Sequence, residues 1–152
     1  MNAPKVDAPK VDAPKTNAST NAPTILDPAA SPEHAVFREA ARAGRFVIPV
    51  CRSCGKPHWY PRARCPFCVD GEIEWRESSG AGTVYSWSTT QRASPPHAIA
   101  YVTLAEGPSV LTSIVDSDLQ DLKIGAAVEV VLTEVEDGMF FPFFRLKRPA
   151  PR

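Results

Sequence analysis

Apolar and polar positions alternate across the second half of the chain, which predicts a small β domain. Runs rich in valine, isoleucine, threonine and aromatic residues recur, and turn-forming residues separate them. The breaks fall at Gly107-Pro108, at Gly125 and at Asp137-Gly138, where Asp-Gly is a strong signal for a two-residue hairpin. The candidate strands are residues 82–90, 98–106, 109–116, 127–136 and 139–147. Five strands of this kind fit a closed OB-fold barrel, with a five-stranded sandwich as the alternative.

The last predicted strand, "MFFPFFRLK", is apolar on both faces. Phe140 and Phe144 point to one side, whereas Phe141 and Phe143 point to the other. Pro142 indicates an edge or a bulge, because it has no N–H for a sheet ladder. A barrel wall buries one face, so the remaining aromatic side chains indicate an interface with another protein or a surface covered by a helix.

Upstream of the strands, one segment has the period of a short amphipathic helix over residues 32–43. Ser31 can cap its first turn and Gly44 can end it. This helix packs on its own domain or docks on another chain. Its apolar stripe consists of Val36, Phe37, Ala40 and Ala41.

All four cysteines lie between the helix and the barrel, in "CRSCGKPHWYPRARCPFC". Their spacing gives two tight turns that each present two sulfurs, which is typical of a rubredoxin-like zinc ribbon with structural Zn²⁺. Iron uses the same four ligands, so the spacing leaves iron open. A filled shell of thiolates has no position for substrate, and any chemistry must lie elsewhere. The predicted metal ligands are Cys51, Cys54, Cys65 and Cys68.

Charge is unevenly distributed although 17 basic and 17 acidic residues cancel. Residues 45–69 contain five basic side chains and no acidic one, whereas residues 70–146 contain twelve acidic and four basic. An acidic barrel disfavours binding to a nucleic-acid backbone. The basic side chains either balance the negative tetrathiolate or form a phosphate site. They are Arg45, Arg52, Lys56, Arg62 and Arg64.

The chain offers no recognisable catalytic group. His34, His58 and His97 are better explained as surface or packing residues, and His97 is expected in a loop. There is no nucleophile motif and no glycine-rich phosphate loop. The sequence therefore does not indicate an enzyme that acts alone.

With these elements in order, the chain resembles a family of zinc-ribbon plus OB-fold proteins that accompany thiolases and related acyl-CoA enzymes, long filed as of unknown function. The resemblance covers residues 33–146. The motifs that carry it are "CRSCG", "YPRARCPFC", "GAGTVYSWS", "AYVTLAEG" and "DLKIGAAVEVV", followed by the aromatic last strand. A departure is Tyr60-Pro61 before Arg62, where family members often have two prolines; it affects no cysteine.

The resemblance implies an accessory or scaffold subunit of an acyl-CoA thiolase, acyltransferase or aldolase complex. Its partner would be a thiolase-like, ketosynthase-like or aldolase protein, with a hotdog-fold hydratase as a further partner. Lys56, Arg62 and Arg64 are the candidates for contacting the phosphates of coenzyme A or acyl-CoA shared with that partner. The rival functions are a nucleic-acid-binding zinc-ribbon and OB-fold protein, or a self-sufficient acyl-CoA hydrolase or transferase.

These observations divide the chain into four parts. Residues 1–30 repeat alanine- and proline-rich units such as "APKVD" and predict a disordered tail, with a docking arm as the functional alternative. The helix follows over residues 31–44, the zinc ribbon over 45–76 and the OB-fold domain over 77–148. No apolar run near 20 residues and no secretory leader are visible, so a cytoplasmic protein without membrane contact is expected.

Overall fold

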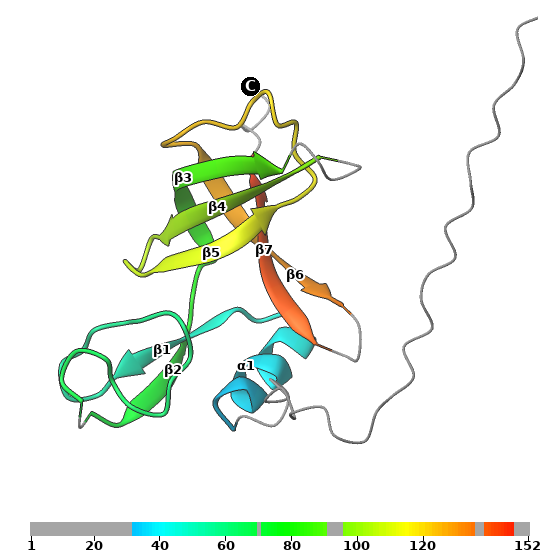
Figure 1. Ribbon diagram of the computed structural model, residues 1–152. Helices are drawn as coiled ribbons and strands as arrows, with labels where there is room; N and C mark the ends of the chain where they lie inside the picture. The colour runs from blue at the N-terminus through cyan, green and yellow to red at the C-terminus, as the bar shows by residue number, and fades with distance from the viewer. Residues whose placement is uncertain (1–31, 70, 91–95, 136–138, 148–152) are drawn as a thin grey trace, which may run out of the picture.

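The computed structural model describes residues 32–69, 71–90, 96–135 and 139–147 (Figure 1). The predicted tail, the cap at Ser31 and the turn at Asp137-Gly138 lie outside these residues. The described elements are helix α1 (Pro32–Arg42) and strands β1 (Val47–Cys51), β2 (Ile73–Glu77), β3 (Ala81–Thr90), β4 (His97–Leu104), β5 (Ser109–Ile114), β6 (Ala127–Glu134) and β7 (Phe140–Leu146). No described helix has the length and apolar character needed to cross a membrane.

The zinc-ribbon part consists of the antiparallel pair β1 and β2, and the cysteine segment connects them. The register places Cys51 opposite Ile73 and Val47 opposite Glu77. Every residue of β1 is buried, whereas β2 is half-buried or exposed. Cys51, the first predicted metal ligand, therefore lies at the end of a strand whose position is fixed by tertiary packing.

The other five strands form a closed barrel in the order β3-β4-β5-β7-β6, so the prediction of an OB-type barrel is confirmed and the sandwich alternative is wrong. A bulge between Val84 and Ser86 interrupts β3, which pairs with β6 before the bulge and with β4 along its length. Such bulges bend a strand and help a small sheet to close. The closure between β5 and β7 is parallel and consists of one pair, Ile114 with Phe144.

The barrel core follows from strict alternation along its central strands. In β4 the even positions from Ala98 to Leu104 are buried, and the odd positions from His97 to Tyr101 are exposed. His97 begins this strand, so its prediction as a loop residue is wrong, because the paired ladder with Thr90 already includes it. Phe144 of β7 is fully buried inside the barrel.

An aromatic cluster joins the helix, the ribbon and the barrel. The Phe46 ring lies 6.3 Å from Phe37 of α1, 5.8 Å from Trp59 and 6.4 Å from Phe144, measured between ring centroids. Most of the predicted helical stripe is buried, but Val36 is 41% exposed. Val36 belongs to the predicted stripe, but the rest of the chain covers its side chain only in part.

Candidate metal centre and adjoining surfaces

The four cysteine sulfurs converge, since all lie within 4.8 Å of one another. Cys51 Sγ lies 3.5 Å from Cys68 Sγ, and Cys54 Sγ lies 3.7 Å from Cys65 Sγ. A tetrahedral Zn²⁺ with sulfur ligands at about 2.3 Å separates those sulfurs by roughly 3.8 Å. The geometry of the donor set therefore fits one tetrahedral ion.

Backbone donors favour the thiolate form that a metal requires. The backbone N–H of Cys54 donates to Cys51 Sγ at 3.4 Å, and that of Phe67 donates to Cys65 Sγ at 3.3 Å. The Cys54 N–H lowers the pKa of the Cys51 thiol to about 6. A hydrogen bond with the Cys51 sulfur raises the pKa of Cys68 to about 12, because it holds the Cys68 thiol protonated beside the Cys51 thiolate. A bound cation resolves this conflict by attracting all four thiolates.

Gly71 is a residue of the site that the sequence analysis missed. A Cβ at this position would lie 2.1 Å from Cys51 Sγ and 3.1 Å from Cys68 Sγ. Glycine is needed here because the backbone of residue 71 passes too close to the cysteine sulfurs for a side chain to fit. The signal available in the sequence was a glycine three residues after the last cysteine.

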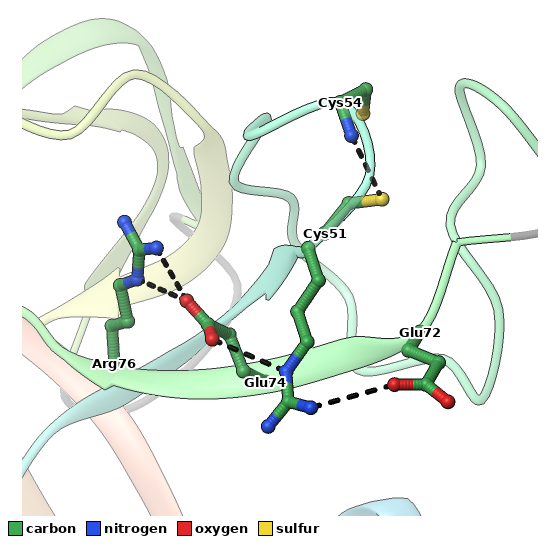
Figure 2. A network of polar contacts seen from close by, with 6 residues as sticks. Cys51, Cys54, Glu72, Glu74 and Arg76 are labelled. Carbon is green, nitrogen blue, oxygen red and sulfur yellow. Dashed lines mark hydrogen bonds and ion pairs between the residues drawn. The ribbon is translucent and has the colours of Figure 1, made fainter.

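Arg52 belongs to an ion-pair network on the ribbon surface, whose other members Glu72, Glu74 and Arg76 are labelled in Figure 2. Its guanidinium lies 3.4 Å from a carboxylate oxygen of Glu72 and 3.3 Å from one of Glu74. Arg76 pairs with the other oxygen of Glu74. Glu72, just before β2, and Glu74 of β2 thus balance Arg52, which leaves the other basic side chains to be considered for a phosphate site.

Lys56 and Arg62 of the predicted phosphate site line one pocket of about 400 Å³ between the ribbon and the β4–β5 turn. Arg64 is not among the residues that line it. The Lys56 ammonium lies 5.1 Å from the centre of the Phe67 ring, an arrangement that positions a cation at the pocket wall. Tertiary structure therefore brings together two of the three predicted cations.

The same pocket is lined by two polar residues that were not predicted as functional, the buried His58 and the half-buried Glu106. His58 is 3% exposed, and neither ring nitrogen has a hydrogen-bond partner. Burial, together with the charge of Arg62, lowers the pKa of His58. A neutral imidazole, with one donor and one acceptor, is therefore buried in the wall of this pocket.

Glu106 connects the pocket to the linker between ribbon and barrel. Its Oε1 accepts hydrogen bonds from the backbone N–H and the hydroxyl of Ser79 at 2.8 and 2.9 Å, whereas its Oε2 is buried without a partner. Burial opposes ionisation, but the hydrogen bonds outweigh it and lower the pKa of Glu106. The carboxylate thus holds the linker through one of its two oxygens.

The remaining histidines have packing or edge positions. The His34 ring packs edge-on against Tyr60 with centroids 4.9 Å apart. His97 Nδ1 lies 2.9 Å from the Thr90 hydroxyl at the end of the β3–β4 pair. These contacts are ring packing for His34 and a hydrogen bond at a strand end for His97.

An exposed apolar surface covers the outer side of the barrel. It comprises Trp87, Ile99, Tyr101, Leu111 and Phe141, which are 37–58% exposed. A second pocket, of about 420 Å³, lies between this surface and α1. The prediction of exposed aromatics on β7 therefore holds for Phe141, and α1 covers the strand only in part.

A two-stranded ribbon with four converging thiols, followed by a five-stranded OB barrel, defines the class of the protein. Residues 38–74 match the family described as "ChsH2, rubredoxin-like zinc ribbon domain", and residues 75–133 match "ChsH2, C-terminal OB-fold domain". A "DUF35 domain-containing scaffold protein" of Methanothermobacter thermautotrophicus is 33% identical over 108 residues, which are 64% of this chain and 81% of the relative. The chain belongs to this DUF35 family.

Two further similarities concern multi-component proteins. A solved structure described as "Ltp2-ChsH2(DUF35) aldolase" is 29% identical with a TM-score of 0.67, covering 78% of this chain and 98% of that chain. A "Probable enoyl-CoA hydratase alpha subunit" of Thermomonospora curvata is 32% identical over 127 residues. The match covers 78% of this chain but 39% of that relative, so the similarity concerns one part of a longer protein.

Proposed function

We propose that this chain is an accessory subunit of an acyl-CoA enzyme complex, in which it binds a catalytic partner and helps to form the acyl-CoA site. The partner would be thiolase-like, ketosynthase-like or an aldolase, with a hotdog-fold hydratase as a further partner. The observation that carries this proposal is the similarity to a DUF35 chain named together with an aldolase. The exposed apolar surface supports it, since such surfaces often mark protein interfaces.

In this proposal Cys51, Cys54, Cys65 and Cys68 bind a structural Zn²⁺. The ion would supply folding free energy to the cysteine segment, which has few buried side chains of its own. It would take no part in the reaction, because four protein ligands complete its shell. Cytoplasmic location, where thiols stay reduced, is consistent with this role.

The pocket with Lys56 and Arg62 is the proposed contact for the phosphates of coenzyme A. Two cations at one pocket wall can bind phosphate oxygens. Arg64 is exposed on the same loop outside the lining, so its contribution would be smaller.

The decisive experiment is affinity purification of the full chain from its native source at low salt. We expect a stoichiometric catalytic partner, identified by mass, and an absorbance ratio without nucleic acid. The complex of a Lys56→Ala/Arg62→Ala variant should bind acyl-CoA at least tenfold more weakly than the wild-type complex. Lys123→Ala, an exposed cation on the barrel, is the control and should leave affinity unchanged.

Two results would contradict the proposal. A chain that elutes alone, or with nucleic acid that high salt removes, would reject the accessory role. Full acyl-CoA affinity in an intact complex with the double variant would reject the phosphate contact while leaving the accessory role standing.

A further inference from the structure

The barrel closes at one point between β5 and β7, and Pro142 explains why the pairing stops there. Ile114 pairs with Phe144, and the backbone N–H of Val115 donates to Phe144 O at 2.8 Å. In a parallel ladder the next donor would be the N–H two residues earlier on β7, directed at Leu111 O. That residue is Pro142, which has no N–H. Its carbonyl accepts instead from the Thr112 hydroxyl at 2.7 Å.

The backbone groups of Ser109 and Leu111 therefore face an open edge. Leu104 N–H donates to Pro108 O at 2.9 Å, so β5 pairs with β4 through its even-numbered residues. The backbone N–H of Val115 donates to β7, so the backbone groups of the odd-numbered residues of β5 point away from β4. Among the residues the structure describes, no strand pairs with this side of β5 before Ile114. A barrel that is closed in outline thus retains a short free strand edge.

The open edge borders the pocket of about 420 Å³ between β5, β7 and α1. Figure 1 shows the beginning of β7 near α1 and away from the beginning of β5. The pocket wall is formed mainly by aromatic and aliphatic side chains and includes no acidic residue. Phe37, Trp59 and Phe140 lie at its base and sides, and Leu111 and Tyr101 connect it to the exposed apolar surface.

We propose that this edge binds an extended segment of the catalytic partner, which adds as a short strand beside Ser109 and Leu111 and places one bulky apolar side chain in the pocket. This inference rests on the proposed function for the existence of a partner and specifies how that partner is held. Backbone pairing along the edge gives affinity, and the pocket selects the side chain. The occupant is an extended peptide because Leu111 presents both a donor and an acceptor, which a free acyl chain or lipid does not satisfy.

The edge is suited to an added strand because, among the described residues, the pairing of β5 with β7 is limited to Ile114, and the earlier residues of β5 have no strand partner on that side. Free edges invite pairing, and proteins usually blunt them with charged side chains or bulges. On β5 the outward positions carry Ser109, Leu111 and Ser113, and none is charged. Pro142 blunts the β7 side of the gap, so the incoming segment would pair with β5.

The test measures amide hydrogen exchange by NMR on the full chain, with a phage-displayed library of random twelve-residue peptides as the probe. We expect selected peptides to carry alternating apolar residues. A synthetic selected peptide should slow exchange at the Leu111 amide at least tenfold. The Val110 amide, which faces β4, is the internal control and should change little.

Two variants at one position separate backbone pairing from side-chain contact. Ser109→Pro removes the outward N–H at the start of an edge strand, where proline is tolerated, and should weaken peptide binding at least tenfold. Ser109→Ala keeps the N–H and loses the same hydroxyl, which lies 3.0 Å from that of Thr103. Its affinity should stay within twofold of wild type.

Several results would overturn the inference. They are a library that yields no binder, peptides that bind without slowing exchange at Leu111, or a Leu111 amide already protected in the isolated chain by its own residues or a second copy. A purified complex that survives Ser109→Pro would also overturn it, with the accessory role intact. Conversely, peptide pairing at β5 in a chain that purifies without a partner would reject the proposed function and leave the strand edge established.

Discussion

The cysteine segment and the barrel are held together by different physical means. Within residues 51–69 few side chains are buried, namely Cys51, His58, Pro61 and Cys65. The barrel buries a continuous set of aliphatic residues and the ring of Phe144. Apolar burial stabilises the barrel at about 25 cal/mol per Å². The cysteine segment has little such area, so its stability depends on the ion that its thiols fit.

The two regions are nevertheless coupled. Phe46 touches Trp59 on the ribbon side and Phe144 on the barrel side. The backbone N–H of Ser78 donates to Phe46 O at 2.8 Å, which fixes the linker against the same residue. The comparison teaches that the core of the barrel can position the cysteine segment, which has no core of its own. The internal shape of that segment depends instead on the metal that its thiols fit.

Loss of the metal should have the largest effect, because it should unfold the cysteine segment and leave the barrel folded. Zinc binding in isolated zinc fingers supplies about 10–16 kcal/mol, so Cys54→Ser is expected to abolish stoichiometric zinc and unfold the cysteine segment. The barrel amides should keep their exchange protection, because their contacts lie elsewhere. Zinc content and amide exchange measure the two outcomes, with Ser53→Ala as the control. Simultaneous unfolding of the barrel would show that the regions are one cooperative unit.

Removal of the Phe144 ring from the barrel core should have the reverse effect, because it should destabilise the barrel and leave the metal site intact. Phe144→Ala is expected to lower the free energy of unfolding by about 3–5 kcal/mol, since a fully buried ring leaves a cavity. Phe141→Ala, at 46% exposure, is the matched control and should cost about 1 kcal/mol or less. Urea unfolding measures both, and zinc content should stay at one ion per chain. Equal losses for the two variants would reject the assignment of the core to one face of β7.

The smallest expected effect is a loss of folding stability at acidic pH that comes from His58, in the pocket between the ribbon and the β4–β5 turn. Because the folded pKa of His58 is below its usual 6.5, the unfolded chain binds a proton first as pH falls. Stability should therefore be full above pH 6.5 and decline as pH falls from there toward the folded pKa. His58→Phe should flatten the decline of the unfolding midpoint between pH 7 and 5, and His97→Asn should not. An unchanged slope in His58→Phe would exclude His58 as its source.

Local patterns were sufficient for the parts of the molecule that depend on neighbouring residues. Alternation predicted the barrel strands to within a few residues, because burial of one face requires that period. Cysteine spacing predicted the convergence of four sulfurs, because each pair lies on one turn. Periodicity shows which positions share a face but not how much of that face a neighbour covers, so it could not predict that Val36 stays 41% exposed.

The sequence by itself therefore determined a zinc-ribbon and OB-type chain. Tertiary structure alone decided that Glu106 of the β4–β5 turn lies in a pocket with Lys56, Arg62 and His58. It also decided that Gly71 lies against Cys51 Sγ and that Pro142 leaves Leu111 without its ladder donor. These placements depend on contacts between residues far apart in the chain. Barrel closure fixes such contacts, and no local period encodes them.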